Sequence, residues 1–220
     1  QFAVVASHEA LQSAGLGGEL PDAERVGVIV GSGIGGMETF EEQHSNLILK
    51  GHRRVSPFFI PMMISDMAAG QVSITFGLKG PNFGTVSACA SGANAIGHAW
   101  ELLRCGRAER VLAGGYDGLN QLVFSGFDSL QALSPTVCRP FDAHRDGLGI
   151  GEGAAMIAVE TLESARRRGA VILGELSGYG VTIDLHHLTQ PHPQGDAALA
   201  SMTQSCAMAR LTPAHIDYAN

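Results

Sequence analysis

The sequence has little charge for its length and no basic run. Charged residues make up 16% of the 220 residues, and the formal net charge is −7. No cluster of lysine and arginine is long enough to follow a phosphate backbone, which argues against binding to nucleic acid. No apolar run approaches the length of a bilayer span, and no signal-peptide pattern opens the printed sequence. We therefore expect a soluble cytoplasmic protein that binds neither nucleic acid nor membrane.

The sequence also lacks paired cysteines. Its four cysteines are Cys89, Cys105, Cys138 and Cys206, and their spacing contains no CxxC pair and no metal-ligand pattern. Unpaired cysteines are typical of reduced thiols in the cytoplasm. We expect neither disulfides nor a structural metal.

What the sequence does have is apolar residues and glycine. Hydrophobic residues make up 45% of the chain, and there are 29 glycines without a collagen-like period. This composition predicts a folded core with many tight turns and close backbone approaches.

One stretch, residues 80–106 (GPNFGTVSACASGANAIGHAWELLRCG), carries the clearest chemical signal. It predicts a short buried strand around Phe83 and Thr85, a sharp turn at Cys89, and a helix in which Ile96, Trp100 and Leu103 recur at helical spacing. Small residues fill both flanks of this helix (Ala93, Ala95, Gly97 and Ala99), so we expect it to be buried and to pack closely on two sides. A thiol in such a turn lies at a helix N-terminus, where free N–H groups and the helix dipole stabilise a thiolate. The arrangement is that of a nucleophile elbow with sulfur in place of a serine oxygen. The alternative is a small buried core cysteine.

A glycine-rich loop, Gly31–Gly36 (GSGIGG), satisfies the G-x-G-x-x-G pattern after a predicted strand at residues 25–31. A dinucleotide site also requires a second strand that ends in an acid about 20 residues later. Here that region is basic and irregular (KGHRRVSPF), so we expect no nucleotide cofactor.

Two further clusters could suggest metals. Asp142, Asp146 and Glu152 lie close together in the sequence, but interleaved Arg139 and Arg145 favour salt bridges and turn caps over Mg²⁺. The segment at residues 184–193 (DLHHLTQPHP) holds three histidines without a third well-spaced ligand or a cysteine. We interpret both as structural or surface features.

Other elements follow from periodicity. An amphipathic helix opens the sequence and another short helix ends at a glycine, while two more strands follow the Cys89 helix. The expected helices cover residues 1–15, 38–50, 162–169 and 197–210, and the expected strands cover residues 110–115, 154–160 and 171–180. Residues 55–69 end in a helix, residues 121–134 form a loop with a short helix, and residues 212–220 form a cap that approaches a strand. A strand, helix and strand without a hairpin signal predict a parallel βαβ unit around the Cys89 helix.

The motifs SACASG, AGG, GF…ALS, RPFD…RDG…GEGA and an HxT loop occur in one register along the whole chain. Together they resemble the elongating β-ketoacyl-acyl carrier protein synthases of the thiolase-like superfamily. The resemblance implies a thiolase-like α/β fold of αβαβα layers, in which two duplicated halves each place a mixed sheet between helices. Residues 1–169 would form most of the first half, and residues 170–220 would open the second.

The resemblance also assigns roles to residues. Cys89 would be the acyl-accepting nucleophile, with its own N–H in an oxyanion hole. The acyl pocket would include Ile34, Phe59 and Phe127, and His187 and Thr189 would lie where the phosphopantetheine arm of an acyl carrier protein enters. The family acts as homodimers or as ketosynthase heterodimers and uses no cofactor beyond the phosphopantetheine of its partner.

The family's catalytic histidines, its lysine and its FGFGG loop match nothing in these 220 residues. We therefore expect the sequence to be an excerpt of a longer chain, which also begins inside a helical pattern. Three alternatives remain open: a non-catalytic partner subunit of the chain-length-factor type, a thiolase or starter-unit synthase, and an unrelated interaction domain. Partner subunits of that type usually lack the cysteine, and the RPFD…RDG…GEGA and HxT segments favour the elongating branch.

Overall fold

A computed structural model of the chain describes residues 1–219. Its contacts divide the chain into two compact units, Gln1–Ala170 and Val171–Asn220. The expected boundary between residues 169 and 170 lies one residue from this division. Each unit is described by itself below.

The first unit is built on a mixed sheet of four strands in the order β2-β1-β3-β4. Strands β1 (Val26–Gly31), β2 (Asn82–Thr85) and β3 (Arg110–Asp117) run parallel, and β4 (Gly153–Glu160) runs antiparallel beside β3. Every residue of β1 is buried, as expected of a central strand covered on both faces. The predicted strands at residues 25–31, 110–115 and 154–160 are confirmed, and so is the parallel direction of β2 and β3, which flank the Cys89 helix with β1 between them.

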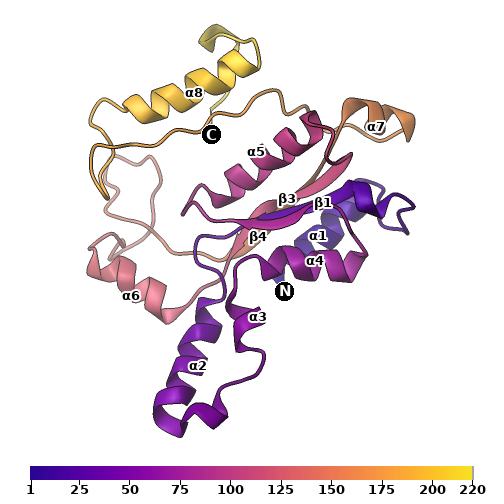
Figure 1. Ribbon diagram of the computed structural model, residues 1–220. Coiled ribbons are helices and arrows are strands. Elements are labelled where there is room, and N and C mark those ends of the chain that lie inside the picture. The colour runs from indigo at the N-terminus through magenta and orange to yellow at the C-terminus, as the bar shows by residue number, and fades with distance from the viewer. Residues whose placement is uncertain (220) are drawn as a thin grey trace. The chain divides into compact units, whose positions relative to one another are not determined.

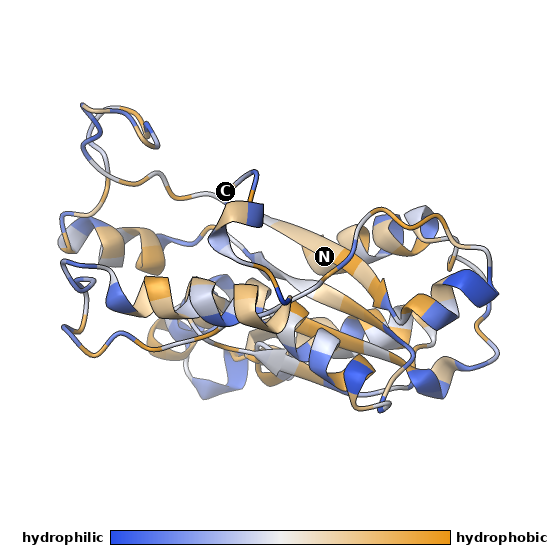
Figure 2. Ribbon diagram, turned by 90° about the horizontal axis from the view of Figure 1, so that it is seen from above, coloured by the Kyte–Doolittle hydropathy of each residue, from blue (hydrophilic) through white to orange (hydrophobic). Residues whose placement is uncertain are grey.

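Helices cover both faces of this sheet (Figure 1). Helices α1 (Phe2–Ser13) and α4 (Met67–Phe76) lie on one face, and α5 (Ser91–Arg104) lies on the other. The first face packs Val28, Val30 and Leu112 into one core, and the second packs Ile29 and Val111 into another. In Figure 2 the strand ribbons are mostly orange and pale, consistent with a sheet buried between these helices.

Helix α5 packs closely through its small residues, as predicted, but two of its large apolar residues are less covered than their spacing predicts. The residues it buries are small, namely Ser91, Ala95, Gly97 and Ala99, together with Leu103, whereas Ile96 and Trp100 are only partly covered. Small side chains at four-residue spacing let the helix lie close to the sheet, so close approach outweighs the apolar stripe here.

The prediction that β2 is buried is wrong for the described residues. This strand forms one end of the sheet, and Phe83 within it is 37% exposed. Its aromatic and β-branched composition predicts a strand correctly, but burial depends on neighbours, and β2 pairs on one side only.

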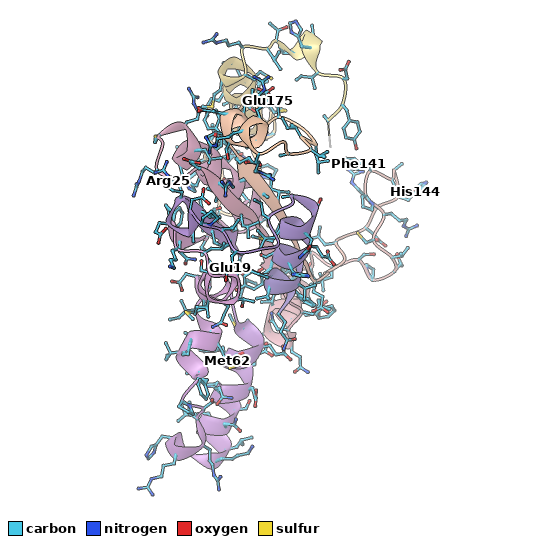
Figure 3. All side chains as sticks on the ribbon, turned by 90° about the vertical axis from the view of Figure 1, so that its right-hand side faces the viewer. Glu19, Arg25, Met62, Phe141, His144 and Glu175 are labelled. Atoms are coloured by element: carbon cyan, nitrogen blue, oxygen red, sulfur yellow. The ribbon has the colours of Figure 1, made fainter. Side chains whose placement is uncertain are left out.

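An arm of helices extends from the carboxyl end of β1. It contains α2 (Met37–Lys50), the short turn η2 (His52–Arg54) and α3 (Phe59–Met63), and Met62 of α3 is labelled on it in Figure 3. Helix α6 (Gln121–Ser129) contacts α2, where the Glu41 carboxylate accepts a hydrogen bond from the Leu122 N–H. The loop that follows α6 carries Phe141, which is 97% exposed, and His144 (Figure 3).

An ion-pair network holds the opposite, amino-terminal end of β3. The Arg110 guanidinium donates to both oxygens of Asp22, at 3.0 and 2.8 Å. It also lies 3.8 Å from Glu160, which in turn accepts hydrogen bonds from Arg168 just beyond α7 (Leu162–Arg167). The network ties the edge of the sheet to the segments before β1 and after β4.

The second unit contains α8 (Asp196–Met208) and the short turn η3 (Pro213–His215). The predicted helix at residues 197–210 is confirmed. The predicted strand at residues 171–180 is wrong: this segment forms no ladder, and Val171 and Leu173 are 83% and 88% exposed. Strand propensity produces a strand only when a partner supplies the hydrogen bonds, and no described residue does so here. Asn220, the last residue of the segment expected to approach a strand, lies outside the described residues.

Within residues 1–219, none of the helices combines the length and the apolar content that crossing a membrane would require.

Candidate active site

Two loops meet at the carboxyl ends of the neighbouring parallel strands β1 and β2. The loop after β1 is Ser32–Gly36, and the turn after β2 holds Cys89. A Cβ added to Gly33 would lie 3.6 Å from the carbonyl oxygen of Ala88, so these loops are in contact. In parallel sheets this edge is where ligand sites form.

The Cys89 turn is held by its own hydrogen bonds. The Ser91 hydroxyl donates to the Ala88 carbonyl at 2.6 Å and accepts from the Ser87 N–H at 2.9 Å. Beneath the turn, the Thr85 hydroxyl donates to the Ser91 carbonyl at 2.9 Å. Ala88 has a φ of +49°, a left-handed conformation that a residue with a Cβ seldom adopts. A strained residue directly before an exposed thiol is the geometry expected of a nucleophile elbow.

The thiol lies directly before a long helix. Helix α5 begins at Ser91, and Ala90 at its cap position supplies no side-chain hydrogen bond. Among the described residues no side chain therefore takes the place of an anion at this helix N-terminus, where the dipole favours negative charge. Cys89 is exposed, so the core-cysteine alternative is wrong for the described residues.

Two glycines allow α5 to approach the sheet. A Cβ on Gly31 would lie 2.3 Å from the carbonyl carbon and oxygen of Ser91, and one on Gly115 would lie 3.0 Å from Gly92. Contacts below 3.0 Å cannot be accommodated without moving backbone, so glycine at position 31 sets the height of the elbow above the sheet.

The glycine-rich loop is fastened by a residue that the sequence reasoning missed. The Asp117 carboxylate accepts a hydrogen bond from the Ser32 hydroxyl at 2.9 Å and another from the Gly33 N–H at 3.1 Å. The dinucleotide pattern directs attention to an acid after the second strand, whereas this acid ends β3, 85 residues from Ser32. The sequence signal that could have identified Asp117 is an acidic residue just after a strand predicted to be parallel.

Burial raises the pKa of neighbouring Tyr116, and the charges of Asp117 and Asp66 raise it further, although a hydrogen bond with Ser32 lowers it in part. The phenol therefore stays protonated at neutral pH and adds no charge beside the loop.

Of the three expected pocket residues, Ile34 lies on this loop, and Phe59 lies on a helix whose other end contacts it. Ile34 lies on it and is 37% exposed. Phe59 opens α3, whose last residue, Met63, accepts a hydrogen bond from the Gly36 N–H at 3.0 Å. The Phe59 ring lies 6.2 Å from that of Phe40 on α2. Phe127 is half-buried on α6, which contacts the arm through α2.

His187 and Thr189 belong to the second unit. The His187 Nδ1 accepts a hydrogen bond from the Thr189 N–H at 3.2 Å, and both residues are exposed. The Asp184 carboxylate accepts from the backbone N–H groups of His192 and His186, and these bonds hold the pKa of Asp184 below its ordinary value. The loop is thus organised by its own side chains.

Two of the three clustered carboxylates, Asp142 and Asp146, bond within their own loop, as predicted, whereas Glu152 accepts a hydrogen bond from the Leu119 N–H before α6. Arg139 lies 3.8 Å from Asp146, and Asp142 accepts a hydrogen bond from the His144 N–H. Hydrogen bonds from Ser134 and Thr136 hold the pKa of Asp146 below its ordinary value.

Comparison with known proteins shows which family this chain belongs to. Residues 1–165 match the family model of the β-ketoacyl synthase N-terminal domain. The chain belongs to the β-ketoacyl synthase family. The resemblance inferred from the sequence motifs is therefore confirmed.

Curated relatives of this β-ketoacyl synthase chain include 3-oxoacyl-[acyl-carrier-protein] synthase 2 of Staphylococcus aureus and of Synechocystis. The chain is 47% identical to the first and 43% to the second, over its whole length in both cases. It covers 56% and 54% of these proteins, so it spans about half the length of the curated relatives it matches.

Solved structures confirm the thiolase-like α/β fold. A β-ketoacyl synthase from Burkholderia phymatum is 38% identical with a TM-score of 0.91, over 98% of this chain and 54% of that one. A ketosynthase in complex with its type II PKS acyl-carrier protein is 29% identical with a TM-score of 0.91, over 99% of this chain and 57% of that one.

Proposed function

We propose that this chain carries the acyl-accepting half of an elongating β-ketoacyl-acyl carrier protein synthase, with Cys89 as its nucleophile. The observation that carries the proposal is the exposed thiol directly before α5, on a turn strained at Ala88, in a chain of this family. The alternative of an unrelated interaction domain is excluded by the family match.

In the first step the Cys89 thiolate attacks the carbonyl carbon of an acyl thioester on a carrier protein. A new C–S bond to Cys89 forms, the old C–S bond breaks, and the phosphopantetheine thiol leaves with the proton that Cys89 gave up. The backbone N–H of Cys89 stabilises the tetrahedral oxyanion.

In the second step malonyl-carrier protein loses CO₂, and its carbanion attacks the acyl carbon on Cys89. The Cys89 sulfur leaves and a β-ketoacyl-carrier protein forms, with no net oxidation or reduction. The histidines and lysine that the family uses for this step match no residue here, so we assign only acyl acceptance to residues of this chain.

Other residues of the chain supply binding in this proposal. Ile34, Phe59 and Phe127 form apolar wall for the acyl chain, and His187 with Thr189 contacts the phosphopantetheine arm. No resident cofactor or metal takes part, because the phosphopantetheine arrives with the carrier. We place the protein in the cytoplasm, as a homodimer or ketosynthase heterodimer. We expect an acyl carrier protein and a second ketosynthase-type subunit as partners. Solved complexes of neighbours, one with an acyl-carrier protein and one with a chain length factor, support this.

A partner subunit of the chain-length-factor type is the second candidate. A structure of a ketosynthase/chain length factor is 26% identical with a TM-score of 0.87. The fold therefore fits both roles, and the retained Cys89 favours the catalytic one. A thiolase or starter-unit synthase is disfavoured by the curated relatives, which are named as 3-oxoacyl synthases.

The test is acyl transfer to the full-length protein, followed by intact mass under denaturing conditions after incubation with an acyl-carrier protein. We expect an acyl increment that Cys89→Ser abolishes. Cys105→Ser and Cys138→Ser are matched controls, since these thiols are also exposed, and both variants should keep the increment. Absence of an increment on the wild-type protein would instead support the partner-subunit role.

A further inference from the structure

Asp117 faces the glycine-rich loop from the end of the neighbouring strand. Strands β1 and β3 pair in parallel with Gly31 opposite Gly115, so Asp117 lies two residues beyond this pair, level with the loop. Its Oδ1 atom accepts hydrogen bonds from both Ser32 and Gly33, at 2.9 and 3.1 Å. Hydrogen bonds to an ionised acceptor are about twice as strong as those between neutral groups.

Ser32 passes this constraint along the loop. Its side chain is buried, with only 1% of the residue exposed, and its Oγ atom accepts a hydrogen bond from the Gly35 N–H at 2.8 Å. A hydroxyl has a single hydrogen, and Asp117 accepts it, so the Ser32 oxygen is left to accept hydrogen bonds from the Gly35 N–H and the neighbouring Tyr116 phenol. The carboxylate thus fixes the orientation of the group around which the loop folds.

The loop contacts the Cys89 turn on one side and α3 on the other. On one side Gly33 lies against Ala88, the strained residue before Cys89. On the other side the Gly36 N–H bonds to Met63 at the end of α3. Ile34 lies between these two contacts, so its position relative to the thiol depends on how the loop is held.

We propose that Asp117 is a positioning residue, whose hydrogen bonds to Ser32 and Gly33 fix the placement of Ile34 relative to Cys89 and so set which acyl chains the site accepts. The inference rests on the proposed function, because it gives Ile34 the role of pocket wall. Asp117 itself touches no substrate in this arrangement and acts through the loop.

The experiment compares Asp117→Ala and Asp117→Asn with wild type in the full-length protein. Alanine removes both acceptors, whereas the asparagine amide keeps one oxygen for Ser32. Glu19→Ala is the control, since Glu19 precedes the amino end of β1 in the sequence, whereas the loop follows its carboxyl end. Two ratios are measured. The first is kcat/KM for a carrier protein loaded with a long acyl chain, divided by kcat/KM for one loaded with a short chain. The second is the rate of Cys89 alkylation by a long-chain N-alkyl iodoacetamide, divided by the rate with iodoacetamide.

We expect Asp117→Ala to change both ratios by about tenfold, because misplacing a positioned group by ~1 Å can alter rates by about 100-fold. Asp117→Asn should lie between alanine and wild type, and Glu19→Ala should match wild type. General loss of folded protein would lower both rates of each ratio together and leave the ratios unchanged.

Unchanged ratios in Asp117→Ala would overturn the proposal. If alanine does not fold, as judged by circular dichroism, the asparagine variant decides: a ratio equal to wild type in both assays overturns the proposal as well. The alkylation ratio needs no acyl transfer. A wild-type protein that accepts no acyl group would therefore refute the proposed function, while the alkylation ratio would still decide the role of Asp117.

Discussion

At the scale of single residues, the position of Cys89 depends on glycine at a backbone contact. Gly31 lies where a methyl group would overlap the carbonyl of Ser91, so the first turn of α5 rests directly on the β1 backbone. The thiol of Cys89 is thereby placed by main-chain contacts, which have less freedom to adjust than side chains do.

Substitution of Gly31 by alanine should be severely destabilising. The added Cβ would lie 2.3 Å from backbone atoms of Ser91, and overpacking of this kind costs about 1–3 kcal/mol or more. We expect a lower melting temperature and a reduced rate of Cys89 alkylation in the full-length protein.

The control is Gly126→Ala on α6, where an added Cβ would meet nothing within 4 Å. A helical glycine replaced by alanine gains up to about 1 kcal/mol, so this variant should melt at or above the wild-type temperature. Equal destabilisation by both variants would contradict the close approach described for Gly31.

The sequence predicts the nucleophile but not its support. The residues around Cys89 are contiguous, so strand, turn and helix signals fall within one window. Asp117 acts on Ser32 from 85 residues away, and only the register of β1 with β3 brings the two together. Contacts made through sheet register are invisible to local patterns.

At the scale of elements, the ends of β3 are held by charge. Asp117 fastens the loop at its carboxyl end, and Arg110 joins Asp22 and Glu160 at its amino end. Burial alone would raise the pKa of Glu160, but hydrogen bonds from Arg168 and Ser164 and the charges of Arg168 and Arg110 outweigh it and hold the pKa below its ordinary value of 4.5.

Glu160 should therefore contribute a pH-dependent part of the stability. A lowered pKa in the folded state means that the contribution is present above about pH 4.5 and is lost as the pH falls through the lower folded value. Glu160→Gln should reduce the free energy of unfolding at pH 7 by on the order of 2 kcal/mol, below the 3–5 kcal/mol of a fully buried pair. Its stability should also fall less than that of wild type between pH 5 and pH 3, measured by urea unfolding.

Glu163→Gln on α7 is the matched control. Its carboxylate also pairs with an arginine, at 3.9 Å from Arg167, but its side chain is 89% exposed. Exposed pairs contribute about 0–1 kcal/mol, so this variant should follow the wild-type pH curve closely. If Glu160→Gln and Glu163→Gln had the same curve of stability against pH, burial of the network would add nothing to the pH-dependent stability.

Elements were predicted well where the pattern is local and poorly where partners matter. The helices α1, α2, α5, α7 and α8 and three strands follow from periodicity and stop signals. Strand β2 is more exposed than its composition predicts, and residues 171–180 have strand composition without a partner. Burial and pairing are properties of the neighbours and are absent from the segment's own sequence.

At the scale of the whole molecule, the described residues expose much apolar surface. Leu173, Leu185, Leu188 and Phe141 are each at least 85% exposed, and the sheet ends at β2 and β4 without further strands within residues 1–219. Exposed apolar side chains and open strand edges favour association in water.

A polypeptide limited to residues 1–220 should therefore bind a hydrophobic dye and aggregate at micromolar concentration, unlike the full-length protein. Dye fluorescence and light scattering of the two polypeptides, measured side by side, check this. Equal dye binding and equal scattering would mean that this surface is covered by nothing else in the protein.

The small-residue face of α5 also has an entropic consequence. Alanine and glycine have no rotamers to change, so the contact between this helix and the sheet cannot relax by side-chain rearrangement. By contrast, α3 of the arm carries Ile60, Met62 and Met63, whose long side chains have many rotamers. If Phe59 of α3 forms acyl wall as proposed, the sulfur is carried on a stiff support while this part of the wall lies on a compliant one. Variation in acyl specificity among such enzymes should accumulate in the compliant part, at little expense to the rate constant set by the stiff one.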